Sequence, residues 1–355
     1  MIRKKLFKTI NILFLILWMV FVDFSVLGCK STSNYKIEKK SVTEKPSWIE
    51  NPEKSAPSSL FLSAVGIGYT EQDARSNAAV ALATTIQQNI SSTLTTKTSE
   101  SLANNKSASV LASVDETIKT ATIVDDLVGI YIKEYWSNPN GAVYALAQIN
   151  RSEATAYYTQ QINNNNKIIS DNLRFADKAG SNFDSFAYIQ KSIPLAQKNR
   201  NYFTILSVIN NSAFNTLELI SPEELSNISY KAASKISIGI FVDKDKNDLI
   251  YSTLAKVFTS YGFIVGKATD SNYPYLLNAK LSFVTNKGLR YIEVNCHSDI
   301  SLIDANTKMA IVSDSYDDRI SHKDEFLAES RAYTVLEEYI LEKYKLKFES
   351  FVQNR

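Results

Sequence analysis

The pattern of apolar and polar positions divides the chain into segments of different character. Four cations precede an unbroken apolar run from Ile12 to Val22, and residues 30–45 are polar and charged without any apolar period. From residue 46 onward, stretches that alternate with a period of two are interspersed with stretches whose apolar residues recur three and four positions apart. These periods are typical of half-buried strands and of amphipathic helices, respectively. The pattern predicts an α+β fold behind a polar tether.

The segment 46–151 is expected to form an α+β module. A β-rich run from Leu60 to Val65 leads into Gly66-Ile67-Gly68, which is interpreted as a tight turn before a helix. Thr70 and Asp73 have the spacing of a capping box at the start of that helix. Residues 91–109 either continue the helix or form a mobile excursion. The helix carries a narrow apolar stripe that indicates close packing against a sheet: Ala74, Ala78, Ala81, Leu82, Thr85, Ile86 and Ile90.

A β-hairpin is expected to close this module. Leu127 to Trp136 alternates like a strand and places Tyr131 and Tyr135 on one outward face. Asn138-Pro139-Asn140-Gly141 predicts a turn, because proline fixes φ and Asn-Gly tolerates positive φ. Ala142 to Ile149 is then the partner strand. The two tyrosines either anchor a protein contact or cover the helical layer.

Residues 152–229 are expected to form a helical spacer. Asn150 and Glu153 cap a first helix that runs to about Ala179, and a second helix is expected over 184–210. Ser221-Pro222-Glu223-Glu224 is typical of a third helix start. The second helix contains Pro194, where a kink is expected.

Residues 230–355 predict a second α+β domain. Strands are expected over 236–242, 263–265, 275–286, 289–299 and 300–314, and helices over 247–261 and 323–344.

The first 29 residues read as a secretory leader that ends in a lipobox. The apolar run closes on Val26-Leu27-Gly28-Cys29, which puts a small residue directly before a cysteine. Residues 1–28 are therefore predicted to be a lipoprotein signal peptide that is cleaved between Gly28 and Cys29. Cys29 would become a diacylglyceryl cysteine whose acyl chains, such as palmitate, hold the protein on a membrane. Residues 29–45 would be a tether that reaches roughly 20–25 Å.

Two other readings of this leader stay open. A retained transmembrane anchor needs roughly 20 apolar residues, and extending the run brings in Asp23. An ordinary signal peptide would leave Cys29 as a chance thiol, although the chain has only two cysteines. All three readings place the protein outside the cytoplasmic membrane. Lys30 is not the aspartate that marks inner-membrane retention in some bacteria, which favours the outer membrane.

Removing the leader changes the charge of the protein. Without residues 1–28 the chain has 35 Lys and Arg against 36 Asp and Glu, a net charge of −1 instead of +2. No basic surplus supports binding to nucleic acid. Once Cys29 is acylated, Cys296 has no partner for a disulfide.

The first module resembles a known family. The residues that carry the resemblance are Pro46-Ser47-Trp48-Ile49, the run Phe61 to Gly68, Ala74 and Ala78, and the run Gly141 to Arg151. They are similar to the LPP-twenty lipoprotein family and its relatives among envelope and flagellar-assembly proteins. This resemblance implies a membrane-anchored α+β module with no known enzymatic activity and no catalytic residues. The C-terminal domain resembles the accessory domains of envelope-assembly lipoproteins only distantly.

No motif in the chain carries a specific chemistry. Gly66-Ile67-Gly68 lacks the third glycine of a dinucleotide site, and Glu71 would repel a phosphate. Cys296 and His297 point to opposite faces if they lie in a strand. Asp125-Asp126 and Asp317-Asp318 are expected to be solvated caps or turns, and the acidic loop 243–248 lacks the glycine of a calcium loop. We expect no enzyme, no cofactor and no metal.

These observations lead to a functional hypothesis. The chain is expected to be a non-enzymatic envelope lipoprotein that acts in assembly or maintenance of an envelope structure, flagellar or outer-membrane, through contacts with envelope proteins. The alternative is a periplasmic or surface binding module for a small ligand, lipid or glycan.

Overall fold

The computed structural model describes residues 44–104, 127–269 and 272–355. Residues 45–355 form one compact unit, and the described residues of that range build three apolar clusters. The predicted signal peptide, Gly28, Cys29 and the pair Asp125-Asp126 lie outside the described residues. None of the helices in the described ranges combines the length and the apolar character needed to cross a bilayer. The helices and mixed sheets confirm the α+β class.

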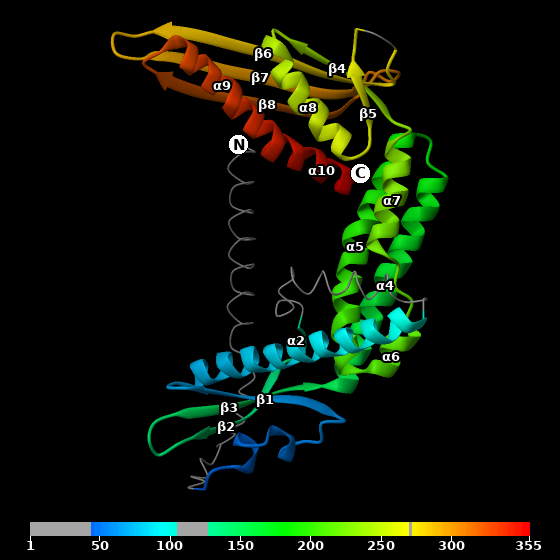
Figure 1. Cartoon of the computed structure of the whole chain (residues 1–355), viewed down its shortest axis with the longest axis vertical. Coiled ribbons are helices and arrows are strands. Elements are labelled where there is room, and N and C mark those ends of the chain that lie inside the picture. The colour runs from blue at the N-terminus through cyan, green and yellow to red at the C-terminus, as the bar shows by residue number, and fades with distance from the viewer. Residues whose placement is uncertain (1–43, 105–126, 270–271) are drawn as a thin grey trace, which may run out of the picture. The chain divides into compact units, whose positions relative to one another are not determined.

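A three-stranded antiparallel sheet follows two short 3₁₀ turns, η1 (Ser47–Ile49) and η2 (Pro52–Lys54). Its strands are β1 (Phe61–Gly68), β2 (Tyr131–Ser137) and β3 (Val143–Asn150), in the order β1-β3-β2. Helix α2 (Glu71–Asn104) lies across one face of this sheet (Figure 1). The predicted capping box is confirmed, because the Asp73 amide donates to Thr70 Oγ1 at 3.1 Å.

The apolar stripe of α2 forms the core of this module. Of the seven predicted stripe residues, Ala81 and Thr85 are half-buried, and the other five are fully buried against β1 and β3, namely Ala74, Ala78, Leu82, Ile86 and Ile90. The predicted turn at residues 138–141 is also confirmed, since the Gly141 amide donates to the Asn138 carbonyl at 2.9 Å and Gly141 has a φ of +90°.

The predicted common face of Tyr131 and Tyr135 is wrong. A β-bulge lies between Ile132 and Glu134, so Tyr131 pairs with Gln148 whereas Tyr135 pairs with Ala145. Gln148 and Ala145 are three positions apart on β3, so their side chains point to opposite faces of the sheet, because side chains alternate along a strand. The extra residue therefore turns the two tyrosines away from each other.

The predicted helical section consists of α4 (Arg151–Asp177), α5 (Asn182–Ile209), α6 (Asn211–Thr216) and α7 (Pro222–Ala233). Asn150 caps α4 and Ser221 caps α7, as the sequence predicts. Helix α5 is continuous through Pro194 and packs against both α4 and α7. Its first turns join the C-terminal core through Phe183 and Phe186, and its last turns join the N-terminal core.

The C-terminal part is a five-stranded mixed sheet with helices on one face (Figure 1). The strand order is β5-β4-β6-β7-β8, with β4 parallel to both of its neighbours and the remaining pairs antiparallel. The strands are β4 (Ser237–Asp243), β5 (Ile264–Lys267), β6 (Tyr275–Lys287), β7 (Ile292–Asp304) and β8 (Ala310–His322). The covering helices are α8 (Leu249–Ser260), which follows the turn η4 (Lys246–Asp248), then α9 (Glu325–Tyr339) and α10 (Lys345–Asn354).

The predicted strand break between Asp299 and Ile300 is wrong. Strand β7 continues to Asp304, whose side chain accepts hydrogen bonds from the amides of Asn306 and Thr307 and so starts the turn. Asp299 interrupts the apolar pattern only because it lies on the solvent face of an unbroken strand. As a result β8 extends to His322, well beyond the predicted end at residue 314.

The last helix is longer than predicted and contains one wide turn. A π-helical turn, Ile340–Tyr344, joins α9 to α10, and the helix reaches Asn354 instead of ending near residue 344. Apart from Tyr333, its buried residues recur every four positions, which in an α-helix would rotate the buried stripe by about 40° per step. The π turn offsets part of that drift. The stripe is Ala328, Ala332, Leu336, Ile340, Tyr344, Phe348 and Val352.

Candidate functional site

Gly66 and Gly68 are packing residues, which corrects the predicted turn. Both lie inside β1, and a Cβ on Gly66 would stand 2.0 Å from the backbone nitrogen of Ala78. A Cβ on Gly68 would stand 2.5 Å from the nitrogen of Ala74. The predicted close approach of helix and strand is therefore confirmed, and the helix backbone occupies the space beside both glycines.

The acidic loop before α8 serves as a helix cap. The carboxylate of Asp245 accepts hydrogen bonds from the amides of Ile250 at 3.2 Å and Tyr251 at 2.8 Å. Asp248 forms an ion pair with Lys267 at 2.7 Å. Two of these carboxylates thus already have partners within the protein.

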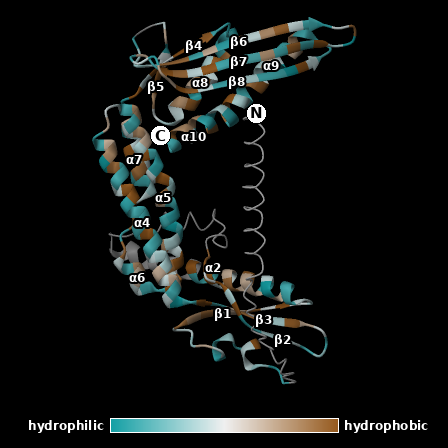
Figure 2. Ribbon diagram, turned by 180° about the vertical axis from the view of Figure 1, so that it is seen from behind, coloured by the Kyte–Doolittle hydropathy of each residue, from teal (hydrophilic) through white to brown (hydrophobic). Residues whose placement is uncertain are grey.

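A cluster of one histidine, two carboxylates and a serine lies on the open face of the C-terminal sheet. Strand β7 pairs with β8 in a register that places His297 directly opposite Asp317. On this face β7 presents polar residues, while its alternate residues are buried under the helices, and Figure 2 shows the corresponding alternation of apolar and polar bands along β6, β7 and β8. Such alternation is typical of an antiparallel sheet with one solvated face.

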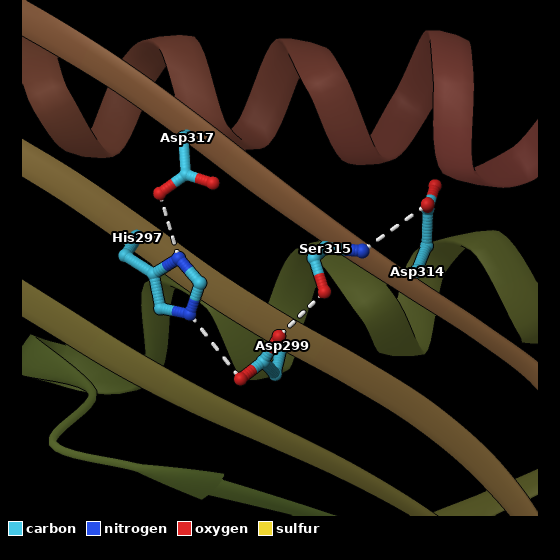
Figure 3. Close-up of polar contacts among 5 residues, drawn as sticks. All are labelled: His297, Asp299, Asp314, Ser315 and Asp317. Carbon is cyan, nitrogen blue, oxygen red and sulfur yellow. Dashed lines mark hydrogen bonds and ion pairs between the residues drawn. The ribbon is translucent and has the colours of Figure 1, made fainter.

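Both nitrogens of the His297 ring are engaged by carboxylates (Figure 3). Nδ1 lies 2.7 Å from Asp317 Oδ1, and Nε2 lies 3.2 Å from Asp299 Oδ2. Ser315 on β8 extends the chain, because its hydroxyl donates to Asp299 Oδ1 at 2.6 Å and its amide donates to Asp314 Oδ1 at 3.1 Å. His297, Asp299, Asp317 and Ser315 form the cluster that we call the His297 network.

The electrostatics of the His297 network favour the imidazolium form. Hydrogen bonds to Asp317 and then to Asp299 raise the pKa of His297 above its ordinary value. Hydrogen bonds from Ser315 and His297 lower the pKa of Asp299. In the charged form both ring N–H groups donate, so the network holds one cation between two anions.

This geometry does not provide a nucleophile with a base. In a catalytic triad one imidazole nitrogen contacts the nucleophile, whereas here Asp299 stands between His297 and Ser315. The two carboxylates lie on opposite edges of the ring, so their oxygens do not converge on one point as metal ligands must. Across the described ranges, no group of three or more His, Cys, Asp or Glu residues is arranged to hold a metal.

The neighbours of His297 point the other way, as predicted. Cys296 is buried under the helices, and burial raises the pKa of its thiol to about 11. On the same side Asp314 accepts hydrogen bonds from Tyr339 and Lys347. Burial alone would raise the pKa of Asp314, but these two donors outweigh it and lower the value. The second histidine, His322, pairs with Ile292 at the far end of β8 and accepts from the Asp324 amide.

Asp317 and Asp318 are exposed to solvent, as predicted, but the prediction that they form a cap or turn is wrong. Both residues lie inside β8, opposite His297 and Cys296. The misplaced strand break hid this pairing, because register follows from where the turn lies. The Asp304-Ala305-Asn306-Thr307 turn is a local signal that separates the two strands. Counting outward from Ile303 and Ala310 beside that turn would place His297 opposite Tyr316, and a register shift between Leu302 and Ile303 brings it opposite Asp317 instead.

A second feature is an open groove where the start of α4 meets the end of α5. Its volume is about 1150 Å³, and hydroxyl and amide side chains line it, among them Ser58, Thr155, Gln160, Asn163 and Asn164. The guanidinium of Arg151 closes one side and donates to the carbonyls of Ser58, Val208 and Ile209. Apolar side chains such as Leu60, Ala156 and Ile209 also line the groove, which is open and not the deep enclosed pocket that a lipid ligand would need.

Comparison with known proteins confirms the family resemblance over the first module. Residues 46–150 match the family model of the LPP20 lipoprotein, the LPP-twenty family. The match covers well under half of the chain and leaves the C-terminal sheet outside it. No curated protein matches the chain.

Several solved structures align with parts of the chain. A secreted protein from Helicobacter pylori is 16% identical and covers 82% of this chain and 96% of its own, with a TM-score of 0.44. A minor lipoprotein from Acinetobacter baumannii is 11% identical over 32% of this chain and 92% of its own, with a TM-score of 0.24. A lipoprotein from Neisseria meningitidis is 11% identical over 30% of this chain and 99% of its own, with a TM-score of 0.21.

Proposed function

We propose, from the match of residues 46–150 to the LPP20 lipoprotein family, that the chain is an envelope lipoprotein that assembles with other envelope proteins and has no enzymatic activity. Cys29 would carry the lipid, and the outer membrane would be the site of anchoring. The C-terminal sheet would supply the contact surface. This proposal extends the family match, which itself supports only a lipoprotein of the cell envelope.

The observation that carries the proposal is the open face of β6, β7 and β8. Among the described residues, the helices lie on the other face of this sheet (Figure 1), and β7 presents a row of polar side chains on the open face. The His297 network holds this face in a defined arrangement, and Lys280 and Arg319 lie in register with Asp299 and Asn295. Alternating charges on a rigid face favour specific protein contacts, because a wrong partner meets like charges.

The absence of enzymatic activity is supported by the local chemistry. His297, the histidine with a raised pKa, has both ring nitrogens occupied, and Cys296 is a buried thiol with a raised pKa. A nucleophile requires an accessible, deprotonated form or an adjacent free base. Neither residue meets that requirement in this arrangement.

A crosslinking experiment in intact cells tests the contact surface. A photocrosslinking amino acid replaces Ser313, whose hydroxyl lies 3.0 Å from that of Ser301 on the open face. The matched control carries it at Arg331, which is exposed on helix α9. We expect one envelope protein, identified by mass spectrometry, to be crosslinked from position 313 and not from position 331. Equal crosslinking from both positions, or none above background, would refute the contact surface.

Lipid attachment has its own test. Radiolabelled palmitate should be incorporated into the wild-type protein and not into the Cys29→Ala variant, and fractionation should place the labelled protein with the outer membrane. Labelling of the variant would refute Cys29 as the attachment site. Recovery in the inner membrane would refute the outer-membrane assignment and leave the contact surface untouched.

The groove beside Arg151 favours a second candidate function, binding of a polar ligand such as a glycan. Its hydroxyl and amide side chains are the groups that hydrogen-bond sugars. Isothermal titration with envelope oligosaccharides would test it. The Asn163→Leu/Asn164→Leu variant is the control, and equal heats from wild type and variant would exclude the groove.

A further inference from the structure

One end of the C-terminal sheet carries two loops side by side. Lys287, Ile292 and His322 are in register across β6, β7 and β8 and form the last row of the sheet. Beyond this row lie the β6–β7 loop, residues 288–291, and the connection to α9 (Figure 1). An ion pair of 2.6 Å between Lys287 Nζ and Glu325 Oε2 joins the end of β6 to the first turn of α9. The structure therefore holds the two loops together at one tip.

Large apolar side chains project from this tip. Leu289 is fully exposed and Phe326 is 75% exposed, while Tyr291 and Leu327 are each about half exposed. A single exposed leucine is ordinary on a protein surface. Four large apolar side chains on one loop and the adjoining first turn of α9 are not, since water solvates such a group poorly and a partner or a membrane usually covers it.

The tip carries a small cationic surplus, with Lys287, Arg290 and Lys323 against Asp324 and Glu325. Glu325 is already paired with Lys287, and Asp324 accepts the Leu327 amide at 2.9 Å as the cap of α9. Within the described part of the chain, Arg290 and Lys323 have no ion-pair partner. Their long side chains can keep the charge in water while their methylene stems follow the apolar residues.

We propose that this tip, residues 288–291 with Phe326 and Leu327, inserts into the interfacial zone of a bilayer that contains anionic lipid. Leucine and phenylalanine would enter the boundary of the acyl chains, and tyrosine is enriched at the level of the headgroups. Arg290 and Lys323 would contact anionic headgroups. Such shallow insertion reaches roughly 5–10 Å, which a loop of this size can provide.

A second copy of the chain fits this tip less well than a membrane. A symmetric contact between two tips would bring Arg290 and Lys323 of one copy toward the same cations of the other. Like charges in contact oppose such a dimer. An anionic membrane offers the opposite charge and a fluid apolar layer that accepts projecting side chains of any shape.

Fluorescent labelling tests the insertion directly. Residues 45–355 are suitable, because they form a compact unit with cores of their own, and buried Cys296 will not take the label. An environment-sensitive dye is attached at Leu289→Cys. The matched control carries it at Met309→Cys, an exposed apolar residue in the β7–β8 turn at the other end of the sheet. Far-UV circular dichroism verifies that both proteins are folded.

With phosphatidylglycerol–phosphatidylcholine vesicles, we expect the dye at position 289 to shift to the blue and to be quenched by nitroxide lipids. The dye at position 309 should do neither. In unlabelled protein, Leu289→Asp combined with Phe326→Asp should weaken vesicle binding by about tenfold or more. Arg290→Gln with Lys323→Gln should remove the preference for anionic over neutral vesicles.

Three results would overturn the proposal. The first is an equal response of the two dyes, or no response of either, in the presence of anionic vesicles. The second is equal binding of the wild-type protein to neutral and anionic vesicles. The third is a blue shift at position 289 without vesicles that grows with protein concentration, because it would identify a second copy of the chain as the occupant. None of these results bears on the open face of the sheet or on Cys29.

Discussion

Replacing Gly66 by alanine should separate helix α2 from the first sheet. The added Cβ would stand 2.0 Å from the Ala78 nitrogen, whereas ordinary contact begins at 3.4 Å, so the helix must move by about 1.4 Å. The obstacle is helix backbone, which no rotamer change can relieve. Such overpacking costs about 3 kcal/mol, the upper end of the usual range.

The expected change is measurable by urea unfolding of residues 45–355. Of the three tryptophans, Trp48 and Trp136 lie in the first module and Trp18 lies in the leader, so tryptophan fluorescence reports on this module alone. With a urea dependence of about 1.5 kcal/mol per molar, a loss of about 3 kcal/mol lowers the midpoint by about 2 M.

Gly180→Ala is the matched control. A Cβ at Gly180 meets nothing within 4 Å. The free energy of unfolding of this variant should therefore equal that of the wild type or exceed it by up to about 1 kcal/mol. Adding Ala78→Gly to Gly66→Ala should not restore stability, because the clash is with the Ala78 backbone. Equal midpoints for Gly66→Ala and Gly180→Ala, or rescue by Ala78→Gly, would refute the reasoning.

Three further predictions concern titrating groups. Because Asp317 and then Asp299 raise the pKa of His297, the stabilisation that they provide is complete below the ordinary value of 6.5 and is lost as pH rises through the folded pKa. Because the His297 ring is exposed, this stabilisation is at most about 1 kcal/mol. An NMR titration should show a lower pKa of His297 in Asp317→Asn than in the wild type. The hydrogen bond from Arg200 lowers the pKa of Glu223 from 4.5 to about 2, so this contribution is present above pH 4.5 and is lost as pH falls toward 2. In Glu223→Gln the free energy of unfolding should therefore fall less between pH 4.5 and pH 2, by at most about 1 kcal/mol. An unchanged pH dependence would contradict this. Cys296, buried with a pKa of about 11, should react with a thiol reagent in urea but not in the native protein, and fast native reaction would argue against its burial.

Local signals in the sequence were sufficient for much of the first module. The capping box at Thr70, the alanine-rich stripe of α2 and the turn before Gly141 each depend on residues close in sequence, and each is confirmed. Helix caps such as Asn150 and Ser221 are local in the same sense. Short-range hydrogen bonding and periodicity determine such features.

The candidate site depends on long-range register and was therefore missed. His297 meets Asp317 because the turn between β7 and β8 begins at Asp304 and because the register shifts by one residue between Leu302 and Ile303. In the sequence, a charged residue on an exposed strand face resembles a strand end. The bulge between Ile132 and Glu134 has no composition signal either, and it reverses every side chain after it. Errors of this kind come from pairing, which a single strand does not encode.

The π turn at Ile340–Tyr344 has an evolutionary consequence. The i→i+5 hydrogen bonding of this turn holds one more residue per turn than the i→i+4 bonding of an α-helix. Ala328 to Leu336 on one side and Phe348 to Val352 on the other are held by the same core, so neither flank can rotate freely. Loss of a single codon within this turn should convert it to ordinary helix at small cost. The same deletion a few residues to either side would rotate buried side chains toward solvent. Relatives of this protein should therefore differ in helix length at this turn and not elsewhere along the helix.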